Sequence, residues 1–290
     1  LRHRNYRLYF MGQIISTAGT WMQSVAMPWL ALTLTHDAFH VGLVIATQFA
    51  PMLVAGQFGG LLADRFPKRR ILVCSQLAFI VPAAVMYYLT SQHLAQYWMV
   101  LVAALAVGSI NVIDVPSRQA FVIEMVGRED LLNAIALNST IFNGAAVIGP
   151  SLAGLIIGLF GVPLCFLINS VSFVASVGAL LLMTNLPALV RTSQQGSMLA
   201  RIREGLDYAR RDPVVGTLLL NVAVFSLFAM NRFTLLPIFA DEVLHTGATG
   251  FGFLTAAQGV GALVGALSLA ILQRRLAAGN VQFLIGLTWS

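Results

Sequence analysis

The stretch Gly60-Leu61-Leu62-Ala63-Asp64-Arg65-Phe66-Pro67-Lys68-Arg69-Arg70-Ile71-Leu72 decides how this chain folds. A long apolar run stops at Asp64, five charged residues stand between positions 64 and 70, and a second apolar run starts at Ile71. Two runs long enough to cross a bilayer, joined by a short charged hairpin, predict two membrane helices whose connection lies in water. Because Lys and Arg are retained on the cytoplasmic side of membranes, the four basic residues predict a cytoplasmic hairpin.

The composition excludes a soluble globular chain. Hydrophobic residues make up 58% of the 290 positions and charged residues only 10%, whereas about a quarter of the residues of a soluble domain are charged. The net charge of +6 could suggest a nucleic-acid partner, but the basic residues fall in loops between apolar runs, so no nucleic acid is expected. Cys74 and Cys165 are expected near opposite membrane faces, too far apart to bridge, and both as core thiols.

The apolar runs predict an all-α, polytopic transmembrane bundle. Eight complete spans are expected at about 8–33, 41–63, 71–90, 97–115, 136–160, 164–186, 214–240 and 250–272. Pro116 is expected to break the helix at the end of the fourth span, and a polar, partly amphipathic connection follows over 118–130. A ninth run begins near Val281 and is cut off at Ser290, so we expect the chain to be part of a longer protein.

The distribution of basic residues predicts the topology. If the spans cross the bilayer alternately, all of the 17 Lys and Arg residues except Arg232 fall on one side, and this side is cytoplasmic. The amino terminus is therefore expected in the cytoplasm of a cell whose inner (plasma) membrane holds the protein. Three parts are predicted: a six-helix half over 1–186, a cytoplasmic linker with an amphipathic helix over 187–212, and an incomplete second half over 213–290.

The charged hairpin resembles the loop between the second and third helices of the major facilitator superfamily, which reads roughly Gly-x-x-x-Asp-Arg-x-Gly-Arg-Arg. Here Pro67 stands where the family has its second glycine, so the turn is expected to be built differently. The resemblance implies a secondary transporter, expected as a monomer, made of two halves of inverted three-helix units that rock around a central cavity.

The fifth span carries the pattern Ala145-Ala146-Val147-Ile148-Gly149-Pro150-Ser151-Leu152-Ala153-Gly154. It resembles a pattern of the fifth helix in exporters of this superfamily that work by antiport. The resemblance implies that the residues of this antiporter motif are Ala145, Gly149, Pro150, Ala153 and Gly154. The small residues allow close approach of two helices, and the proline bends its helix. The alternative is that any interface between membrane helices is rich in Gly and Ala.

Three further strings resemble the subfamily of the enterobactin exporter and related multidrug permeases. They are 1–10, 133–139 and Asp114-Val115-Pro116-Ser117-Arg118-Gln119-Ala120-Phe121. Asp114 and Arg118 could pair across the break at Pro116. An inner-gate role is favoured over proton carriage for Asp114, because a carboxylate so close to the inner face is expected to reach water.

The hairpin has a functional and a structural interpretation. In the first, it forms a latch that holds one conformation until transport breaks it, with Asp64 accepting hydrogen bonds at a helix N-terminus. In the second, it is a solvated loop whose charge only fixes the topology. The residues predicted for the latch and gate are Gly60, Asp64, Arg65, Lys68, Arg69, Arg70, Asp114 and Arg118.

Polar and aromatic residues near the middle of the spans are candidates for a substrate cavity. They are Gln13, Thr17, Trp21, Gln23, Gln48, Asn111, Asn138, Asn143, Asn231 and Arg232. Polar side chains also hold membrane helices together, and Arg232 could instead snorkel to the outer interface. A largely apolar cavity with scattered amides suits bulky, lipophilic small molecules.

These observations predict an exporter of drugs or siderophore-like molecules that works by proton antiport. The alternatives are an importer or uniporter on the same scaffold, or a transport-inactive membrane scaffold or receptor. Ala104 stands where the superfamily often has an arginine tied to proton coupling, which favours the last alternative. The sequence has no glycine-rich phosphate loop and no Cys/His cluster, so no cofactor, metal or enzymatic activity is expected.

Overall fold

The structure of the protein is a computed structural model that describes residues 4–127, 130–184 and 232–272, together with a few residues between 207 and 221. Every regular element among these residues is a helix, which confirms the predicted all-α class. Six long helices come first: α1 Arg4–Thr35, α2 Ala38–Arg65, α3 Lys68–Ser91, α4 Tyr97–Val126, α5 Leu131–Phe160 and α6 Val162–Leu181. They are followed by α9 Arg232–Ile238, the π-helix η1 Phe239–Val243 and α10 Gly247–Leu272.

Five helices of the described residues are long and apolar enough to cross a membrane, and they belong to α2, α3, α4, α5 and α6. Helix α1 has the necessary length, but polar residues such as Gln13, Ser16 and Gln23 lower its hydropathy and are buried against neighbouring helices. The predicted linker over 187–212, most of the seventh span and the ninth span fall almost wholly outside the described residues.

Turns between the helices are short and are set by local residues. Only Phe66 and Pro67 separate α2 from α3. Phe66 is extended, with φ of −118° and ψ of 156°, because a residue before proline avoids the helical region. At the other end of α2, the Asp37 carboxylate accepts the Phe39 N–H over 2.9 Å and caps the helix. Gly161 ends α5 with φ of 82°, a conformation that glycine adopts without strain.

The expectation that Pro116 breaks the fourth helix is wrong. Helix α4 continues without interruption to Val126, so the segment 118–126 belongs to the same helix as the span. The first five helices each contain an internal proline: Pro28, Pro51, Pro82, Pro116 and Pro150. Membrane helices tolerate proline because a break in the helix would leave more backbone groups without hydrogen bonds, and lipid offers no water to replace them. Neighbouring helices satisfy the carbonyl group that the proline frees.

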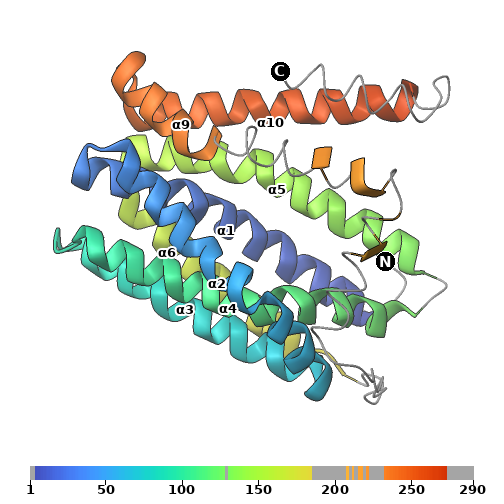
Figure 1. Cartoon of the computed structure of the whole chain (residues 1–290). Coiled ribbons are helices and arrows are strands. Elements are labelled where there is room, and N and C mark those ends of the chain that lie inside the picture. The colour runs from blue at the N-terminus through green and yellow to red at the C-terminus, as the bar shows by residue number, and fades with distance from the viewer. Residues whose placement is uncertain are drawn as a thin grey trace. The chain divides into compact units, whose positions relative to one another are not determined.

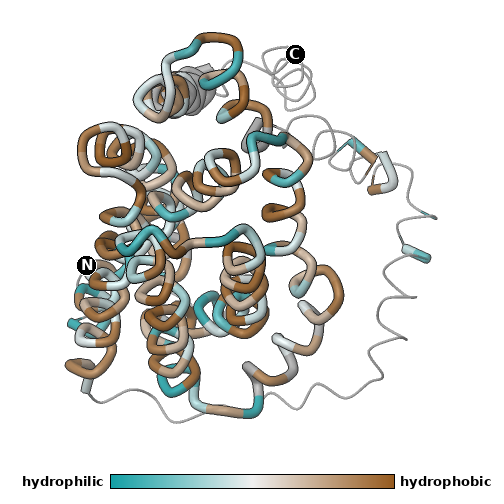
Figure 2. Tube along the Cα trace, turned by 90° about the vertical axis from the view of Figure 1, so that its left-hand side faces the viewer, coloured by the Kyte–Doolittle hydropathy of each residue, from teal (hydrophilic) through white to brown (hydrophobic). Residues whose placement is uncertain are grey.

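The six long helices pack side by side, with α1 in contact with α2, α4, α5 and α6 (Figure 1). Glycines bring several pairs into direct backbone contact. A Cβ on Gly108 would lie 2.1 Å from the Gln48 carbonyl oxygen, and one on Gly59 would lie 1.8 Å from the Val112 carbonyl oxygen, so α2 and α4 cross at these two positions. Hydrophobic positions cover the outward as well as the inward faces of the helices (Figure 2), as expected of a bundle surrounded by lipid.

The described residues of 4–184 and 236–259 belong to one compact unit, and the following sections concern this unit. Its largest apolar cluster joins Trp29 of α1, Ile157 of α5 and Phe166 of α6 to Ala240 of η1 and Phe251 of α10. The segment 236–259 falls in the predicted second half of the chain, so contacts between this segment and the first six helices lie at the boundary between the two predicted halves.

Candidate functional site

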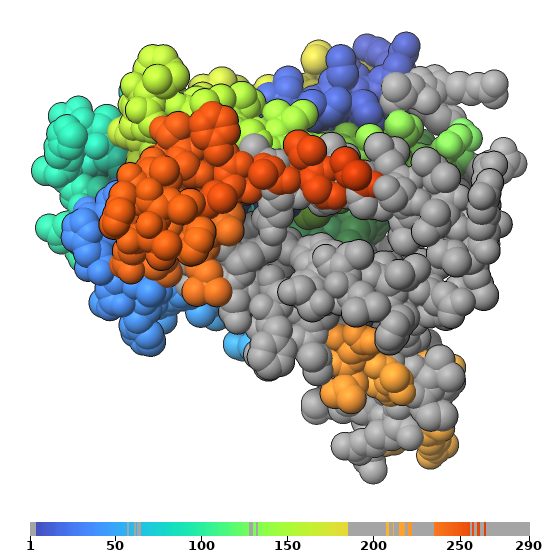
Figure 3. Space-filling view, turned by 90° about the horizontal axis from the view of Figure 1, so that it is seen from above, coloured from blue at the N-terminus to red at the C-terminus, as the bar shows by residue number. Residues whose placement is uncertain are grey.

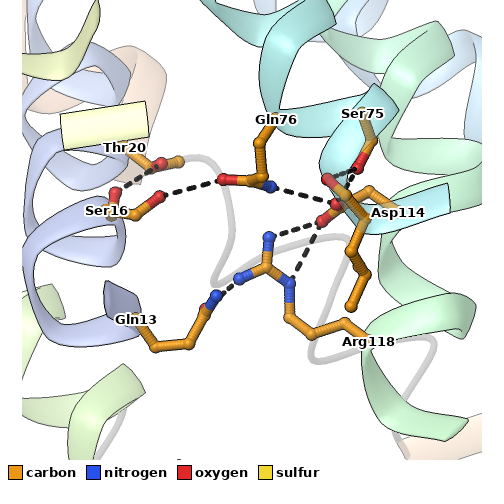
Figure 4. A network of polar contacts seen from close by, with 8 residues as sticks. Gln13, Ser16, Thr20, Ser75, Gln76, Asp114 and Arg118 are labelled. Carbon is orange, nitrogen blue, oxygen red and sulfur yellow. Dashed lines mark hydrogen bonds and ion pairs between the residues drawn. The ribbon is translucent and has the colours of Figure 1, made fainter. Parts of the chain in front are cut away.

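Asp114 is the centre of a network of polar side chains inside the bundle (Figure 4). Its side chain is buried, with 2% of the residue exposed. On one carboxylate oxygen, Oδ1, it accepts hydrogen bonds from Ser75 Oγ over 2.5 Å and from Gln76 Nε2 over 3.1 Å. Both donors come from α3, so this half of the carboxylate connects α4 to α3.

Arg118 occupies the other carboxylate oxygen. Its Nη2 and Nε atoms lie 2.6 Å and 3.1 Å from Asp114 Oδ2, an ion pair between positions i and i+4 of the continuous helix α4. Residues four positions apart lie on the same face of a helix, and the two side chains meet on the face of α4 that points toward α1. The predicted pairing of Asp114 with Arg118 is therefore present, but within one helix and not across a break.

Helix α1 completes the network. Arg118 Nη1 donates to Gln13 Oε1, and Ser16 Oγ donates to Gln76 Oε1 over 3.4 Å. Gln13, Ser16 and Gln76 are all buried. The network thus connects α1, α3 and α4 through hydrogen bonds among mostly buried side chains, and hydrogen bonds to charged groups are the stronger ones in proteins.

The position of the network corrects a second expectation. Asp114 is 2% exposed and is shielded from water by its neighbours. The expectation that this carboxylate reaches water is therefore wrong. Burial of a charged pair is costly, and ionisable residues buried in membrane bundles usually serve a function.

Two further hydroxyl groups near the network are buried without a hydrogen-bond partner in the described part of the chain. They are Tyr9 Oη and Ser117 Oγ, and Tyr9 lies within electrostatic range of both Asp114 and Arg118. Sequence reasoning did not select Tyr9, Ser16, Ser75 or Gln76. The adjacent pair Ser75-Gln76 inside an apolar span was the available signal, because polar side chains at depth seek partners on other helices.

The basic residues of the α2–α3 hairpin have different environments. Lys68 is buried and lies 3.9 Å from Glu124 of α4. Arg69 donates to the carbonyl oxygens of Leu180 and Leu181, each over 2.8 Å, and so satisfies the end of α6. Arg65 and Arg70 are exposed. Gly60 and Asp64 lie in α2, but the side chain of Asp64 is outside the described residues, so the predicted latch stays a prediction.

The small residues of α5 contact two different helices. A Cβ on Gly149 would lie 2.5 Å from Trp21 Cβ and 3.0 Å from the Ala18 carbonyl oxygen of α1. A Cβ on Gly154 would lie 2.1 Å from Gly252 Cα of α10. Figure 3 shows orange residues at the start of α10 beside the yellow-green residues of α5. Ala145, Pro150 and Ala153 are buried on the same helix.

An aromatic contact accompanies this crossing. The rings of Trp29 in α1 and Phe251 in α10 stack with centroids 6.0 Å apart and an angle of 14° between their planes. Together with the contact between Gly154 and Gly252, it closes the packing of α1 and α5 against the first turns of α10. A glycine pair in backbone contact is typical of membrane helices that approach closely.

The candidate cavity residues do not form one cluster. Gln13 belongs to the Asp114 network, while Gln23 is buried and accepts a 2.6 Å hydrogen bond from Asn169 of α6. Trp21 packs edge to face on Phe142. Thr17, Gln48, Asn111 and Asn138 are half-buried and Asn143 is exposed. Asn231 and the side chain of Arg232 lie outside the described residues. Gln23 therefore contributes to helix packing, and the others stay candidates.

Among the residues that the structure describes, no group of three or more His, Cys, Asp or Glu side chains could hold a metal ion. The polar centre of the bundle is instead a carboxylate, a guanidinium, amides and hydroxyls. This set can exchange hydrogen bonds and a proton.

Comparisons with known proteins identify the family. Residues 1–288 match the family model described as "Transmembrane secretion effector". The staphyloferrin A transporter of Staphylococcus aureus is 22% identical over 284 residues, which cover 96% of this chain and 70% of that protein. The enterobactin exporter EntS of Escherichia coli is 27% identical over 287 residues, which cover 97% of this chain and 67% of that protein.

Solved structures show the same fold. A bacterial homologue of the human lysosomal transporter Spinster, in an inward-facing and occupied conformation, matches with a TM-score of 0.75 at 15% identity, over 96% of this chain and 63% of that one. A bacterial homologue of the iron transporter ferroportin matches with a TM-score of 0.59 at 18% identity, over 94% of this chain and 69% of that one. The chain thus spans about two thirds of the length of the proteins it matches. It belongs to the transmembrane secretion effector family of the major facilitator superfamily.

Proposed function

We propose that this protein is a secondary active exporter of siderophore-like or other lipophilic small molecules, which uses proton antiport and alternating access. The family description refers to secretion, and one relative is named an enterobactin exporter. The name of the staphyloferrin A transporter states no direction. Both relatives are siderophore transporters, which supports a similar substrate class for this chain.

The observation that carries the proposal is the buried network around Asp114. A buried ion pair rarely adds stability over apolar packing, because desolvation of both charges offsets their attraction. Its presence inside a bundle that otherwise contains mainly apolar side chains therefore indicates a role beyond packing. Since the network connects α1, α3 and α4, its rearrangement would change how these three helices pack.

Proton exchange at Asp114 is the step that we propose couples the gradient to this rearrangement. Among the acidic side chains that the structure describes, Asp114 is the one that is buried. Its protonation would remove the charge that holds Arg118 and would leave the guanidinium bonded to Gln13 alone. In the reverse step, release of the proton would restore the charged carboxylate, to which Arg118, Ser75 and Gln76 donate in this structure.

The two ends of the bundle then have complementary roles in the proposed cycle. The contact between Gly154 and Gly252 holds α5 against α10 at one end, in the region where the predicted halves meet. The Asp114 network lies farther along α4, toward the end that carries the α2–α3 hairpin. Opening at one end and closing at the other is the motion expected of two rocking halves.

Flux in membrane vesicles of known orientation tests the proposal. In inside-out vesicles with an acidified lumen, ethidium or a catecholate siderophore is expected to accumulate in the lumen while protons leave it. An ionophore that collapses the pH gradient should stop the accumulation. Movement of the same probes out of preloaded vesicles would indicate an importer, flux that ignores the gradient would indicate a uniporter, and no flux would indicate a transport-inactive scaffold.

A further inference from the structure

A groove of about 480 Å³ lies between α2, α3 and α4, and Ser75, which donates to Asp114, is among the residues that line it. Its walls are almost entirely apolar, and Arg70 is its charged member. It exists because α2 and α3 make few contacts with each other, although only two residues join them: α2 packs on α4, and α3 packs on α6 and α4. The residues that line it include Leu62, Phe66, Arg70, Cys74, Ile110 and Ile113.

The groove opens to the outside of the bundle. Leu62 and Phe66 are exposed hydrophobic residues, at 38% and 52%. Cys74, which was expected to be a core thiol, is exposed instead, whereas Cys165 is buried as expected. Apolar side chains that line an open groove of a membrane bundle are suited to contact with lipid tails.

Arg70 stands at the charged end of this groove without an acidic partner in the described part of the chain. The neighbouring cations are engaged within the bundle: Lys68 with Glu124, and Arg69 with the carbonyl groups that end α6. Arg65 is also exposed but does not border the groove. Among the side chains that the structure describes, the hairpin therefore offers the guanidinium of Arg70 directly beside the apolar groove.

We propose that this groove binds an anionic phospholipid, with one acyl chain along the α2–α3–α4 groove and the phosphate on Arg70. A guanidinium binds phosphate oxygens with two parallel hydrogen bonds, and basic pockets between membrane helices are typical sites for anionic headgroups. A water-soluble anion would gain the contact with Arg70 but nothing from the apolar walls. The bound chain would lie against Ser75, whose hydroxyl is 2.5 Å from Asp114.

Lipid retention by the purified full-length protein tests the headgroup contact. Native mass spectrometry would compare phosphatidylglycerol with phosphatidylcholine for the wild type, Arg70→Gln and Arg65→Gln. Arg70→Gln is expected to lower the preference for phosphatidylglycerol about fivefold, which is the contribution of one basic residue near an anionic surface. Arg65→Gln, which removes the same charge from the same hairpin, should keep the wild-type preference. An equal preference in Arg70→Gln and wild type would overturn the proposal.

The thiol of Cys74 tests where the acyl chain lies. In nanodiscs, phosphatidylglycerol should slow the alkylation of Cys74 by N-ethylmaleimide in wild type several-fold and leave its rate in Arg70→Gln unchanged. Ile113→Trp, which fills the groove and keeps Arg70, should also lose the lipid effect and the preference. The buried Cys165 reports folding of each variant, because it should react only after unfolding. An alkylation rate of Cys74 that is the same with and without phosphatidylglycerol would refute the site. This result is expected if a lipophilic substrate or another part of the protein covers the groove.

Discussion

Removal of Arg118 is expected to destabilise the protein more than removal of its partner. Arg118→Gln leaves the Asp114 carboxylate charged, buried and without its counter-ion. Breaking a buried ion pair from one side costs about 3–5 kcal/mol. We expect the lower end, about 3 kcal/mol, because Asp114 keeps the donors Ser75 and Gln76 and because 22% of the Arg118 side chain is exposed.

Asp114→Asn is expected to cost less, about 1–2 kcal/mol. The amide has the shape of the carboxylate and can still accept a hydrogen bond from Ser75, while Arg118 keeps its bond to Gln13 and some access to solvent. In the double variant no buried carboxylate is left without a counter-ion. Its destabilisation should therefore fall below the sum of the two single effects by about 2 kcal/mol, within the range measured for residues in contact.

Equilibrium unfolding of the wild type, both single variants and the double variant in detergent micelles gives the four free energies. An interaction energy of about 2 kcal/mol is the expected result. Effects that add to within about 0.5 kcal/mol, the usual limit for independent sites, would show that Asp114 and Arg118 do not interact as the structure has them, and the reasoning about the network would be refuted.

Three further predictions concern other parts of the chain. Gly154→Ala should lower stability by about 1–3 kcal/mol because its Cβ would meet Gly252, whereas Gly144→Ala on the same helix, with open space around it, should be neutral or stabilising in the same unfolding assay. Hydrogen bonds from the Phe39 N–H and from His40 lower the pKa of the Asp37 carboxyl. The free energy of unfolding should therefore include a stabilisation that is present at neutral pH and is lost as the pH falls through this lowered pKa. Unfolding measured against pH should show this stabilisation in the wild type and not in Asp37→Ala. Asp64→Asn should abolish flux without lowering the amount of folded protein, and normal flux would exclude the latch.

Hydropathy was sufficient to predict the first six helices and α10 but not all of their ends. The third span was expected to start at Ile71, where the apolar run starts, yet α3 begins at Lys68. The fourth was expected to end near residue 115, yet α4 continues to Val126. A hydropathy pattern reports which part of a helix lies in lipid, whereas the helix itself ends where backbone hydrogen bonds end.

The expected break of the fourth helix at Pro116 was wrong for a related reason. In a soluble helix, an internal proline costs about 3 kcal/mol or more and often ends the helix. In a membrane span, ending the helix would expose more backbone groups to lipid than the proline itself removes. The position of Pro116 in the sequence does not carry this information, because it depends on what surrounds the helix.

The members of the network could be suspected one by one, but not their partners. Gln13 and Asp114 were selected as polar residues in or beside spans, under separate roles. Arg118 and Gln13 are 105 positions apart, and Asp114 and Ser75 are 39 apart. Which polar side chains meet depends on the rotation of each helix about its axis, and the packing of glycines such as Gly108 against Gln48 sets this rotation.

Proton-coupled flux in the variant Asp114→Asn tests the proposed role of the network most directly. The full-length protein would be reconstituted in liposomes with an imposed pH gradient, and Asp37→Asn, which changes an acid outside the spans, would serve as the control. Asp114→Asn is expected to be folded and to bind the probe, but to have lost transport driven by the gradient, while Asp37→Asn keeps it. Gradient-driven transport at the wild-type rate in Asp114→Asn would contradict the assignment of Asp114 as the group that couples proton exchange to the movement of the helices.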